Sequence, residues 1–295
     1  MCYYPSKLTV KREWGGNTPT PPYVIVPCGR CHECRMARAR AWQFRFMVER
    51  EKWLHSFFIT LSYDDEHLPY YCIDADGEIK RHPDLSQKYQ RLFRTLDKRS
   101  IQLIFKRLRN DYPLFEFKYY LIGEYGERFG RPHYHLLLFC NKDESFIDEL
   151  LLKYWDKGNY VISDLIAERM IYVTKHHIGF DFNYEGNSIV EKPFRIMSKG
   201  IGSDYDKVMN KELVDWNKRT CDNSFFNYCG QSYYMPRYVR RRLYTEEQIR
   251  DRVVNDWQSI VYEHDLNFNR RNAEAVNRYK QYRDNRAKSL RKGKM

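Results

Sequence analysis

Two apolar runs flank a short glycine-bounded segment near the middle of this 295-residue chain. The runs span residues 117–125 and 133–140, and Gly126-Glu127-Arg128-Phe129-Gly130 separates them. Runs of this composition around a short segment that contains glycine predict an antiparallel β-hairpin. A hairpin forces its two strands to be neighbours in one sheet, so the rest of the fold must be built around this pair.

Elements of alternating type surround the hairpin. Strands are expected at 23–26, 57–63 and 159–162. Helices are expected at 36–54, at 101–111 with Ser100 as N-cap, at 145–155 and at 166–177. From residue 57 onward the order is β-α-β-β-α-β-α, which predicts an α+β fold with a ferredoxin-like antiparallel sheet and helices on one face.

Composition divides the chain into four expected segments. A cysteine-containing arm with a basic helix occupies 1–55, and the sheet with its helices occupies 56–185. A basic, loop-rich extension packed on this core follows over 186–244, and a basic helical tail over 245–295. Thr245 and Gln248 have the spacing of a capping box at the start of the last helix.

Charge and aromatic content indicate a polyanionic partner. The chain has 51 Lys+Arg against 39 Asp+Glu, a net charge of +12, and 25 tyrosines that could stack on unpaired bases. Nucleic acid is therefore the expected partner, and the residues expected to contact it are Arg35, Arg38, Lys199, Arg237, Arg240 and Arg241. Without a membrane-length apolar run or a signal-peptide core, a reducing cytoplasm and no membrane are expected.

His133 and His135 stand one residue apart at the start of the second hairpin strand. Alternate strand residues share a face, so the two imidazoles project together, and Glu124 at the end of the first strand can face them. Glu127 is the alternative carboxylate. Two imidazoles and a carboxylate suit Mn²⁺ or Mg²⁺ acting on a phosphodiester as a Lewis acid. The competing interpretation is a pair of hydrogen-bonded strand histidines.

Tyr172 and Lys175 lie three residues apart on the helix expected at 166–177, and hence on one helical face. A tyrosine near a metal-bound phosphate can act as a nucleophile, and a lysine one turn away can stabilise the charge that develops. Taken alone, this spacing has little predictive value in a chain with 25 tyrosines.

Cys28, Cys31 and Cys34 form an overlapping Cys-x-x-Cys triplet, with Cys2 available as a fourth thiolate. Structural Zn²⁺ suits this spacing, and an iron–sulfur cluster suits it less well. Reduced thiols without a metal are an equally weighted alternative.

The order of these groups, an acidic residue, then His-x-His, then Tyr-x-x-Lys, resembles the HUH endonuclease superfamily. The resemblance implies that the histidines and a third polar residue hold a metal. It also implies that the tyrosine attacks DNA, leaving a 5′-phosphotyrosine and a free 3′-hydroxyl.

Further motifs narrow the resemblance, and they stand at 27–35, 58–69, 123–126 and 131–135. They look like those of the replication initiators of gokushoviruses, single-stranded DNA phages of the microvirus group. The similarity runs from Cys2 to about Lys175, continues through 197–202 to 236–238, and leaves the tail uncovered. Related initiators can carry a second tyrosine four residues after the first, where this chain has His176.

The resemblance implies a metal-dependent nickase and ligase that initiates rolling-circle replication in the host bacterial cytoplasm. Its partners would be single-stranded origin DNA, a host helicase and a host DNA polymerase, since no ATPase phosphate loop is found in the sequence. The alternatives are a transposase or relaxase of the same superfamily and a non-catalytic, zinc-stabilised DNA-binding protein.

Overall fold

The computed structural model describes residues 4–10, 23–81, 88–89, 91–176, 189–205, 215, 225–228 and 231–250. These residues fall into two compact units whose boundaries lie between Phe44 and Arg45 and between Asp204 and Tyr205. The unit of residues 45–204 contains the predicted hairpin. Among the described residues, no helix is long and apolar enough to cross a membrane.

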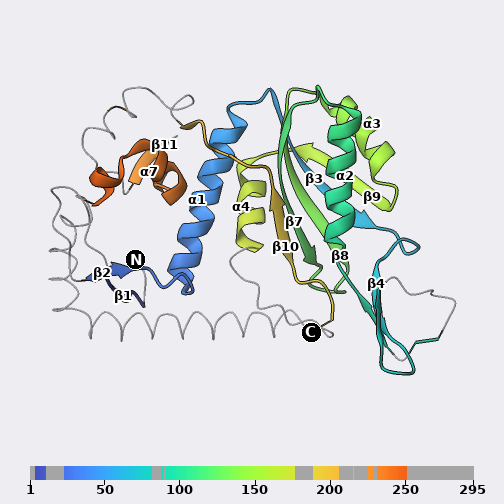
Figure 1. The fold of residues 1–295 in the computed structure, drawn as a ribbon. Helices are drawn as coiled ribbons and strands as arrows, with labels where there is room; N and C mark the ends of the chain where they lie inside the picture. Colours follow the sequence, from blue (N-terminus) through green and yellow to red (C-terminus); the bar gives the residue numbers. More distant parts are fainter. Residues whose placement is uncertain are drawn as a thin grey trace. The chain divides into compact units, whose positions relative to one another are not determined.

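A five-stranded antiparallel sheet is the centre of the 45–204 unit (Figure 1). Its strands, in spatial order, are β10 (Phe194–Met197), β7 (Phe117–Tyr125), β8 (Pro132–Cys140), β3 (His55–Tyr63) and β9 (Gly158–Asp164). The predicted α+β class with an antiparallel sheet is therefore confirmed. β7 and β8 form the predicted hairpin, in the register that pairs Glu124 with His133.

Two helices pack on one face of this sheet. They are α2 (Lys98–Asp111) and α3 (Glu144–Tyr154). Because strand side chains alternate, one set of apolar residues from β3, β7 and β8 meets them. This side of the core contains Ile59, Leu61, Leu121, Leu136, Leu138, Ile101, Phe105, Ile147, Leu150 and Trp155. β7 and β8 are buried along almost their whole length, as expected for strands covered on both sides.

The expectation that all helices lie on one face is wrong. α4 (Ala167–His176) packs on the opposite face, where the ring of Tyr172 contacts those of Phe58 and His135 (Figure 1). The C-terminal part of α1 (His32–Arg50) covers the same face, with Phe46 4.7 Å from Tyr120 between ring centroids. The reason is that β7 and β8 carry apolar side chains on both faces, and each face requires a cover.

Helix starts differ from the expected positions where polar side chains decide them. α2 begins at Lys98, and its N-cap is Asp97 rather than Ser100. The Asp97 carboxylate accepts hydrogen bonds from both the backbone N–H and the hydroxyl of Ser100. α1 begins at His32 and ends at Arg50, four residues earlier than expected at each end. The expected capping box is confirmed, because Thr245 and Gln248 exchange side-chain-to-backbone hydrogen bonds.

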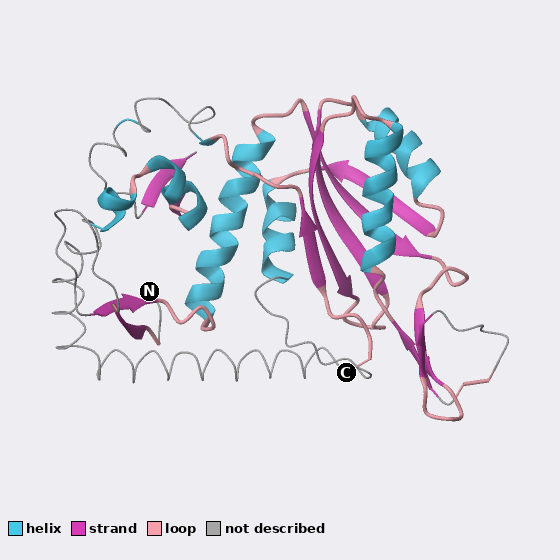
Figure 2. Cartoon of the chain, viewed as in Figure 1, coloured by secondary structure: helices cyan, strands magenta, loops and turns pink. Residues whose placement is uncertain are grey.

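Several strands have no counterpart in the expectations from sequence (Figure 2). A three-stranded sheet of β4 (Tyr70–Ile73), β5 (Ile79–Arg81) and β6 (Arg91–Arg94) is inserted between β3 and α2. β10 adds the edge strand beside β7.

The described residues of the other unit form two hairpins and a short helix. β1 (Ser6–Thr9) pairs with β2 (Tyr23–Val26), the strand expected there. β11 (Phe225–Tyr228) pairs with β12 (Gln231–Tyr234), and α7 (Arg237–Leu243) follows. The basic run expected over 270–295 lies outside the described residues.

Candidate active site

Strand register brings Glu124, His133 and His135 together on the face that α4 covers. Glu124 of β7 is directly opposite His133 of β8, and His135 follows two residues later on the same face. The two imidazole rings are 4.9 Å apart between centroids. This register selects Glu124 as the carboxylate beside the histidines, and Glu127 stands exposed in the hairpin loop.

One carboxylate oxygen is the meeting point of the three side chains. Glu124 Oε1 lies 3.0 Å from His133 Nε2 and 3.1 Å from His135 Nε2. Glu124 and His135 are buried, at 2% and 7% exposure. One ligand atom from each residue fits within a 4.8 Å cluster, and carboxylate oxygen with imidazole nitrogen is a common donor set for divalent metals. The cluster could therefore hold a metal ion.

The other nitrogen of each imidazole has its own partner. His133 Nδ1 lies 3.2 Å from the backbone oxygen of Arg131, and His135 Nδ1 lies 3.1 Å from Thr60 Oγ1. Such partners hold a metal-binding imidazole in orientation. Both rings thereby present Nε2 toward Glu124.

Electrostatics at His133 favour a positive charge at this point. Burial by itself lowers the pKa of His133, but the hydrogen bond to Glu124 and the Arg131 carbonyl outweigh it, so the pKa is raised. When Nδ1 donates to a carbonyl and Nε2 donates to a carboxylate, the ring must be an imidazolium. A metal cation at Nε2 would replace that proton and satisfy the same negative environment.

Tyr172 of α4 reaches the same carboxylate oxygen. Its hydroxyl donates to Glu124 Oε1 at 3.1 Å, and its ring packs edge-on to His135 at 5.1 Å between centroids. Tyr172 is 39% exposed, so the hydroxyl is next to the cluster while the residue keeps access to solvent. Burial and the negative charge of Glu124 raise the pKa of the phenol, which is therefore protonated in this arrangement.

Lys175 lies one turn after Tyr172 on α4, which ends at His176. The side chains of Lys175 and His176 are outside the described part of the structure.

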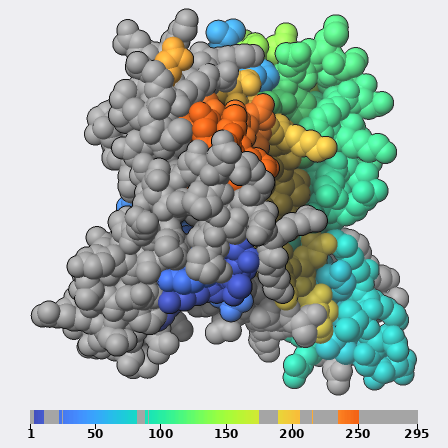
Figure 3. Space-filling view, turned by 60° about the vertical axis from the view of Figure 1, so that its left-hand side comes forward, coloured from blue at the N-terminus to red at the C-terminus, as the bar shows by residue number. Residues whose placement is uncertain are grey.

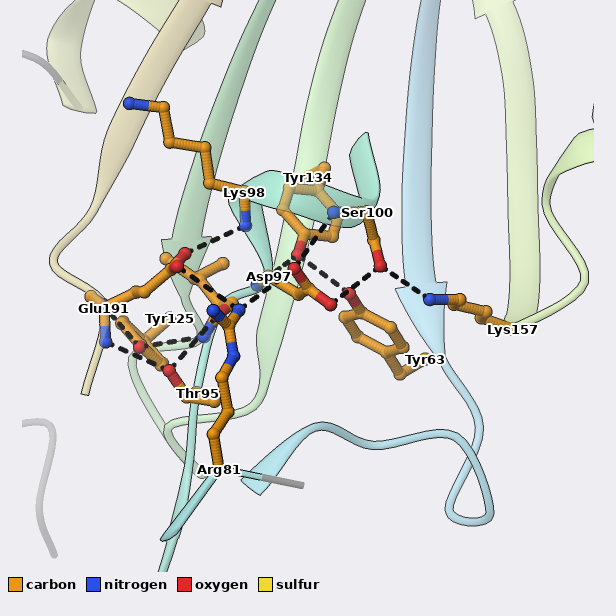
Figure 4. A network of polar contacts seen from close by, with 11 residues as sticks. Tyr63, Arg81, Thr95, Asp97, Lys98, Ser100, Tyr125, Tyr134, Lys157 and Glu191 are labelled. Atoms are coloured by element: carbon orange, nitrogen blue, oxygen red, sulfur yellow. Dashed lines mark hydrogen bonds and ion pairs between the residues drawn. The ribbon is translucent and has the colours of Figure 1, made fainter. Parts of the chain in front are cut away.

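A polar network on the opposite face of the sheet supports β8 between the two histidines (Figure 4). The Tyr134 hydroxyl lies 2.8 Å from the Tyr63 hydroxyl and accepts a hydrogen bond from the Asp97 backbone N–H at 2.8 Å. Arg81 of β5 bridges Asp97 and Glu191 at 3.0 and 3.3 Å. Sequence reasoning missed this network, although strand alternation places Tyr134 opposite the histidines.

Glycine at position 123 leaves room for the Tyr134 ring. Gly123 pairs with Tyr134 across the hairpin, and a Cβ at this position would lie 3.1 Å from the ring and 3.0 Å from Phe194. Contacts this short would displace one of the rings. The glycine in the 123–126 motif thus has a packing role beside the cluster.

The remaining candidate residues are not part of this cluster. Cys28, Cys31 and Cys34 form a second cluster at the start of α1, and Cys2 lies outside the described residues. Lys199 is exposed in the 45–204 unit. Five arginines belong to the other unit, of which Arg38, Arg237 and Arg241 are exposed and Arg35 and Arg240 are half-buried. Part of the segment around α7, drawn in orange, reaches the surface in Figure 3.

Comparison with known proteins gives matches of one kind. Residues 56–177 match the family model of the replication-associated protein ORF2. The chain is 28% identical over 212 residues to the replication-associated protein ORF2 of Spiroplasma virus 4. It is 31% identical over 166 residues to the replication-associated protein VP4 of Bdellovibrio phage phiMH2K. It is 23% identical over 247 residues to the replication-associated protein ORF4 of Chlamydia phage 1. No solved structure matches.

These matches cover 65%, 51% and 75% of this chain and 61%, 47% and 55% of the respective relatives. The chain thus spans about half the length of the curated relatives it matches. The family match encloses Glu124, both histidines and Tyr172, and it excludes the cysteine cluster. The resemblance to phage replication initiators is confirmed: by sequence, this chain is a relative of the replication-associated proteins of these bacterial viruses.

Proposed function

We propose that the chain is a metal-dependent nickase and ligase for single-stranded DNA that initiates rolling-circle replication of a phage genome. One observation carries the proposal: the hydroxyl of Tyr172 and the Nε2 atoms of His133 and His135 all converge on Glu124 Oε1. The split βαβ order of β3, α2, β7, β8, α3 and β9 supports a ferredoxin-like core of the HUH type. The names of the relatives support a role in replication.

Glu124, His133 and His135 would hold the metal. Bound there, Mn²⁺ or Mg²⁺ would polarise the scissile phosphate as a Lewis acid. Mn²⁺ suits the set better than Mg²⁺, because imidazole nitrogen is a poorer ligand for the harder ion. Thr60 and the Arg131 carbonyl would keep the imidazoles oriented.

Tyr172 is the proposed nucleophile. Its phenolic oxygen would form a bond to phosphorus, the bond from phosphorus to the 3′ oxygen would break, and that oxygen would leave as a 3′-hydroxyl. The phenol proton has an acceptor in Glu124 at 3.1 Å and, through the exposed side of Tyr172, a route to solvent. From its position on α4, Lys175 would stabilise the charge that develops.

The reverse reaction restores the DNA strand. Attack of a 3′-hydroxyl on the phosphotyrosine regenerates the phosphodiester and the free phenol, so ligation requires no separate energy source. In the infected bacterial cell, the first 3′-hydroxyl would prime a host polymerase, and a host helicase would unwind the duplex. Tyr172 would act without a second tyrosine on α4, since His176 occupies the position four residues later.

A covalent-adduct assay tests the proposal. The full chain is incubated with Mn²⁺ and single-stranded fragments tiled across the phage genome, and denaturing gels followed by peptide mapping identify any protein–DNA adduct. We expect an adduct at one origin sequence, carried by Tyr172. Tyr172→Phe should abolish it, whereas Tyr160→Phe should not, because the Tyr160 hydroxyl binds Asp148 away from the cluster.

Other outcomes would separate the alternatives. An adduct that persists in Tyr172→Phe would overturn the assignment of the nucleophile. Salt-sensitive binding without an adduct on any fragment would identify a non-catalytic DNA-binding protein. Adducts followed by insertion into unrelated DNA would identify a transposase.

A further inference from the structure

Three cysteines gather where the chain enters α1. The Sγ atoms of Cys28, Cys31 and Cys34 all lie within 4.8 Å of one another, although neither the family match nor the proposed reaction involves them. The Cys28 and Cys34 Sγ atoms are 4.0 Å apart. This separation is about twice the length of a disulfide bond. The three sulfur atoms therefore surround a small common space without being joined to each other.

The backbone around the cluster is folded so that two sulfurs converge from one turn. Gly29 has φ = 72°, a left-handed conformation that glycine adopts without strain. This turn allows the backbone N–H of Cys31 to donate to Cys28 Sγ at 3.4 Å. An N–H directed at a cysteine sulfur stabilises negative charge on it. The Gly29 carbonyl in turn accepts a hydrogen bond from Arg38.

α1 supplies the third sulfur and a favourable electrostatic environment. The helix begins at His32, so Cys34 lies in its first turn, where the exposed backbone N–H groups attract negative charge. Cys31 is buried and the other two cysteines are half-buried. Arg30 and Arg35 are sequence neighbours that would offset the charge of several thiolates.

We infer that Cys28, Cys31 and Cys34 bind one thiophilic metal ion, Zn²⁺, in a structural site separate from the catalytic cluster. In a tetrahedral site with Zn–S bonds of about 2.3 Å, neighbouring sulfur atoms are about 3.8 Å apart. The 4.0 Å between Cys28 and Cys34 matches this spacing. An iron–sulfur cluster fits less well, since each thiolate would bind a different iron and the sulfurs would stand farther apart.

The metal would join the chain before α1 to the first turn of that helix. Within the described residues, the three thiolates are the members of this cluster, and a fourth ligand would come from solvent or from a residue such as Cys2, which lies outside them. By tying residue 28 to residue 34, the ion would stabilise the start of the helix that carries Arg35 and Arg38. The inference does not depend on the proposed nickase activity.

Metal analysis of the full chain tests the site directly. The protein is purified without added metal, and zinc is measured by mass spectrometry in the wild type and in a His133→Ala/His135→Ala variant. Both should contain one equivalent of zinc. After replacement by Co²⁺, both should show the near-ultraviolet thiolate-to-cobalt charge-transfer band and the visible bands of tetrahedral cobalt, since imidazole and carboxylate ligands give no thiolate band.

Variants at the cluster should separate it from the other cysteines. Cys31→Ser should lose the zinc equivalent and the cobalt band. Cys140→Ser should keep both, because Cys140 is a buried cysteine whose Sγ contacts the Lys142 carbonyl outside the cluster. Retention of zinc and the cobalt band by Cys31→Ser would overturn the assignment.

A measurement on the wild type guards against misfolding of the variants. Iodoacetamide labelling, read by peptide mass spectrometry, should modify Cys28, Cys31 and Cys34 slowly with zinc and at least about tenfold faster after chelation. Equal rates in both conditions would overturn the site. The broad visible absorption of an iron–sulfur cluster would overturn the assignment to zinc.

Discussion

Single atoms at the candidate active site are shared by several groups. Glu124 Oε1 accepts from Tyr172 and contacts both imidazoles, while Thr60 and the Arg131 carbonyl hold the outer nitrogens. A carboxylate oxygen in such a position serves both metal binding and alignment of the phenol. Substitutions that preserve shape and remove one charge or one hydrogen bond therefore distinguish these roles.

Glu124→Gln should reduce Mn²⁺-dependent adduct formation by at least about 100-fold, because loss of a metal ligand costs at least as much as loss of its supporting partners. The rate of adduct formation over a Mn²⁺ titration measures the effect. Glu127→Gln is the matched control, since Glu127 is an exposed residue of the neighbouring loop. Equal losses in the two variants would contradict the assignment of Glu124 as the ligand.

Thr60→Val should raise the Mn²⁺ concentration needed for half-maximal adduct formation by about tenfold, because His135 would lose the partner of its Nδ1. The rate at saturating Mn²⁺ should change much less, as expected for a positioning residue. Ser62→Ala is the control, since the Ser62 hydroxyl donates to the Asn159 carbonyl instead. A shift of the same size in both variants would mean that general disturbance of β3 is responsible.

At the scale of elements, β8 serves the two faces of the sheet in different ways. Its histidines face α4, while Tyr134 between them faces α2 and binds the Asp97 backbone and Tyr63. Asp97 caps α2 and pairs with Arg81 of the inserted three-stranded sheet (Figure 4). The strand that carries the metal ligands is thereby joined to a helix and to a second sheet.

Tyr134→Phe should lower the free energy of unfolding by about 1–3 kcal/mol, since it leaves the buried Asp97 N–H without its acceptor. Urea denaturation followed by circular dichroism measures the change. Tyr160→Phe, which loses a hydroxyl bound to Asp148 near solvent, should cost less. A Tyr134→Phe protein as stable as the wild type would show that the network does not support β8.

Acid should weaken the cap of α2. Burial by itself raises the pKa of Asp97, but hydrogen bonds from Ser100 and the charges of Arg81 and Lys157 outweigh it, so the folded-state pKa is lowered. A lowered pKa adds stability above the unfolded-state value, which is about 4, and this stability is lost as the pH falls through the folded-state value. Asp97→Asn should therefore be less stable than the wild type at pH 7, and the difference should shrink below pH 4. A difference that is constant with pH, in thermal melts from pH 7 to 3, would contradict this account.

At the scale of the whole molecule, charge and cysteine content act far from the reacting atoms. The net charge of +12 attracts DNA over a distance, whereas the chemistry is confined to four side chains. Binding and catalysis should therefore respond differently to salt and to substitution.

DNA binding should weaken with salt, with a smaller slope in variants that lose phosphate contacts. Arg237→Gln and Arg241→Gln should each reduce the slope of log K against log salt concentration by about 0.7, the value for one phosphate on a single strand. Lys80→Gln is the control, because Lys80 is already paired with Asp74 at 2.7 Å. Fluorescence anisotropy over a salt series measures the slopes, and unchanged slopes in the two arginine variants would exclude α7 from the DNA contact.

Local sequence patterns were sufficient for much of the central sheet. The hairpin, the strand at β3 and the order of helices and strands follow from periodicity, which depends on near neighbours in the chain. The common face of His133 and His135 follows from the same alternation. The inserted sheet and β10 were missed because their strands have three or four residues, too few for a period to be recognised.

The sequence by itself therefore determined which residues could take part in metal and phosphate chemistry, and on which elements they lie. Only the tertiary structure decided that Glu124 rather than Glu127 meets the histidines, because hairpin register depends on cross-strand hydrogen bonds. It also decided that α4 returns to the face opposite α2 and α3, which brings the Tyr172 hydroxyl to Glu124. Contacts between residues 48 positions apart are set by which apolar faces must be covered, and no local pattern records that requirement.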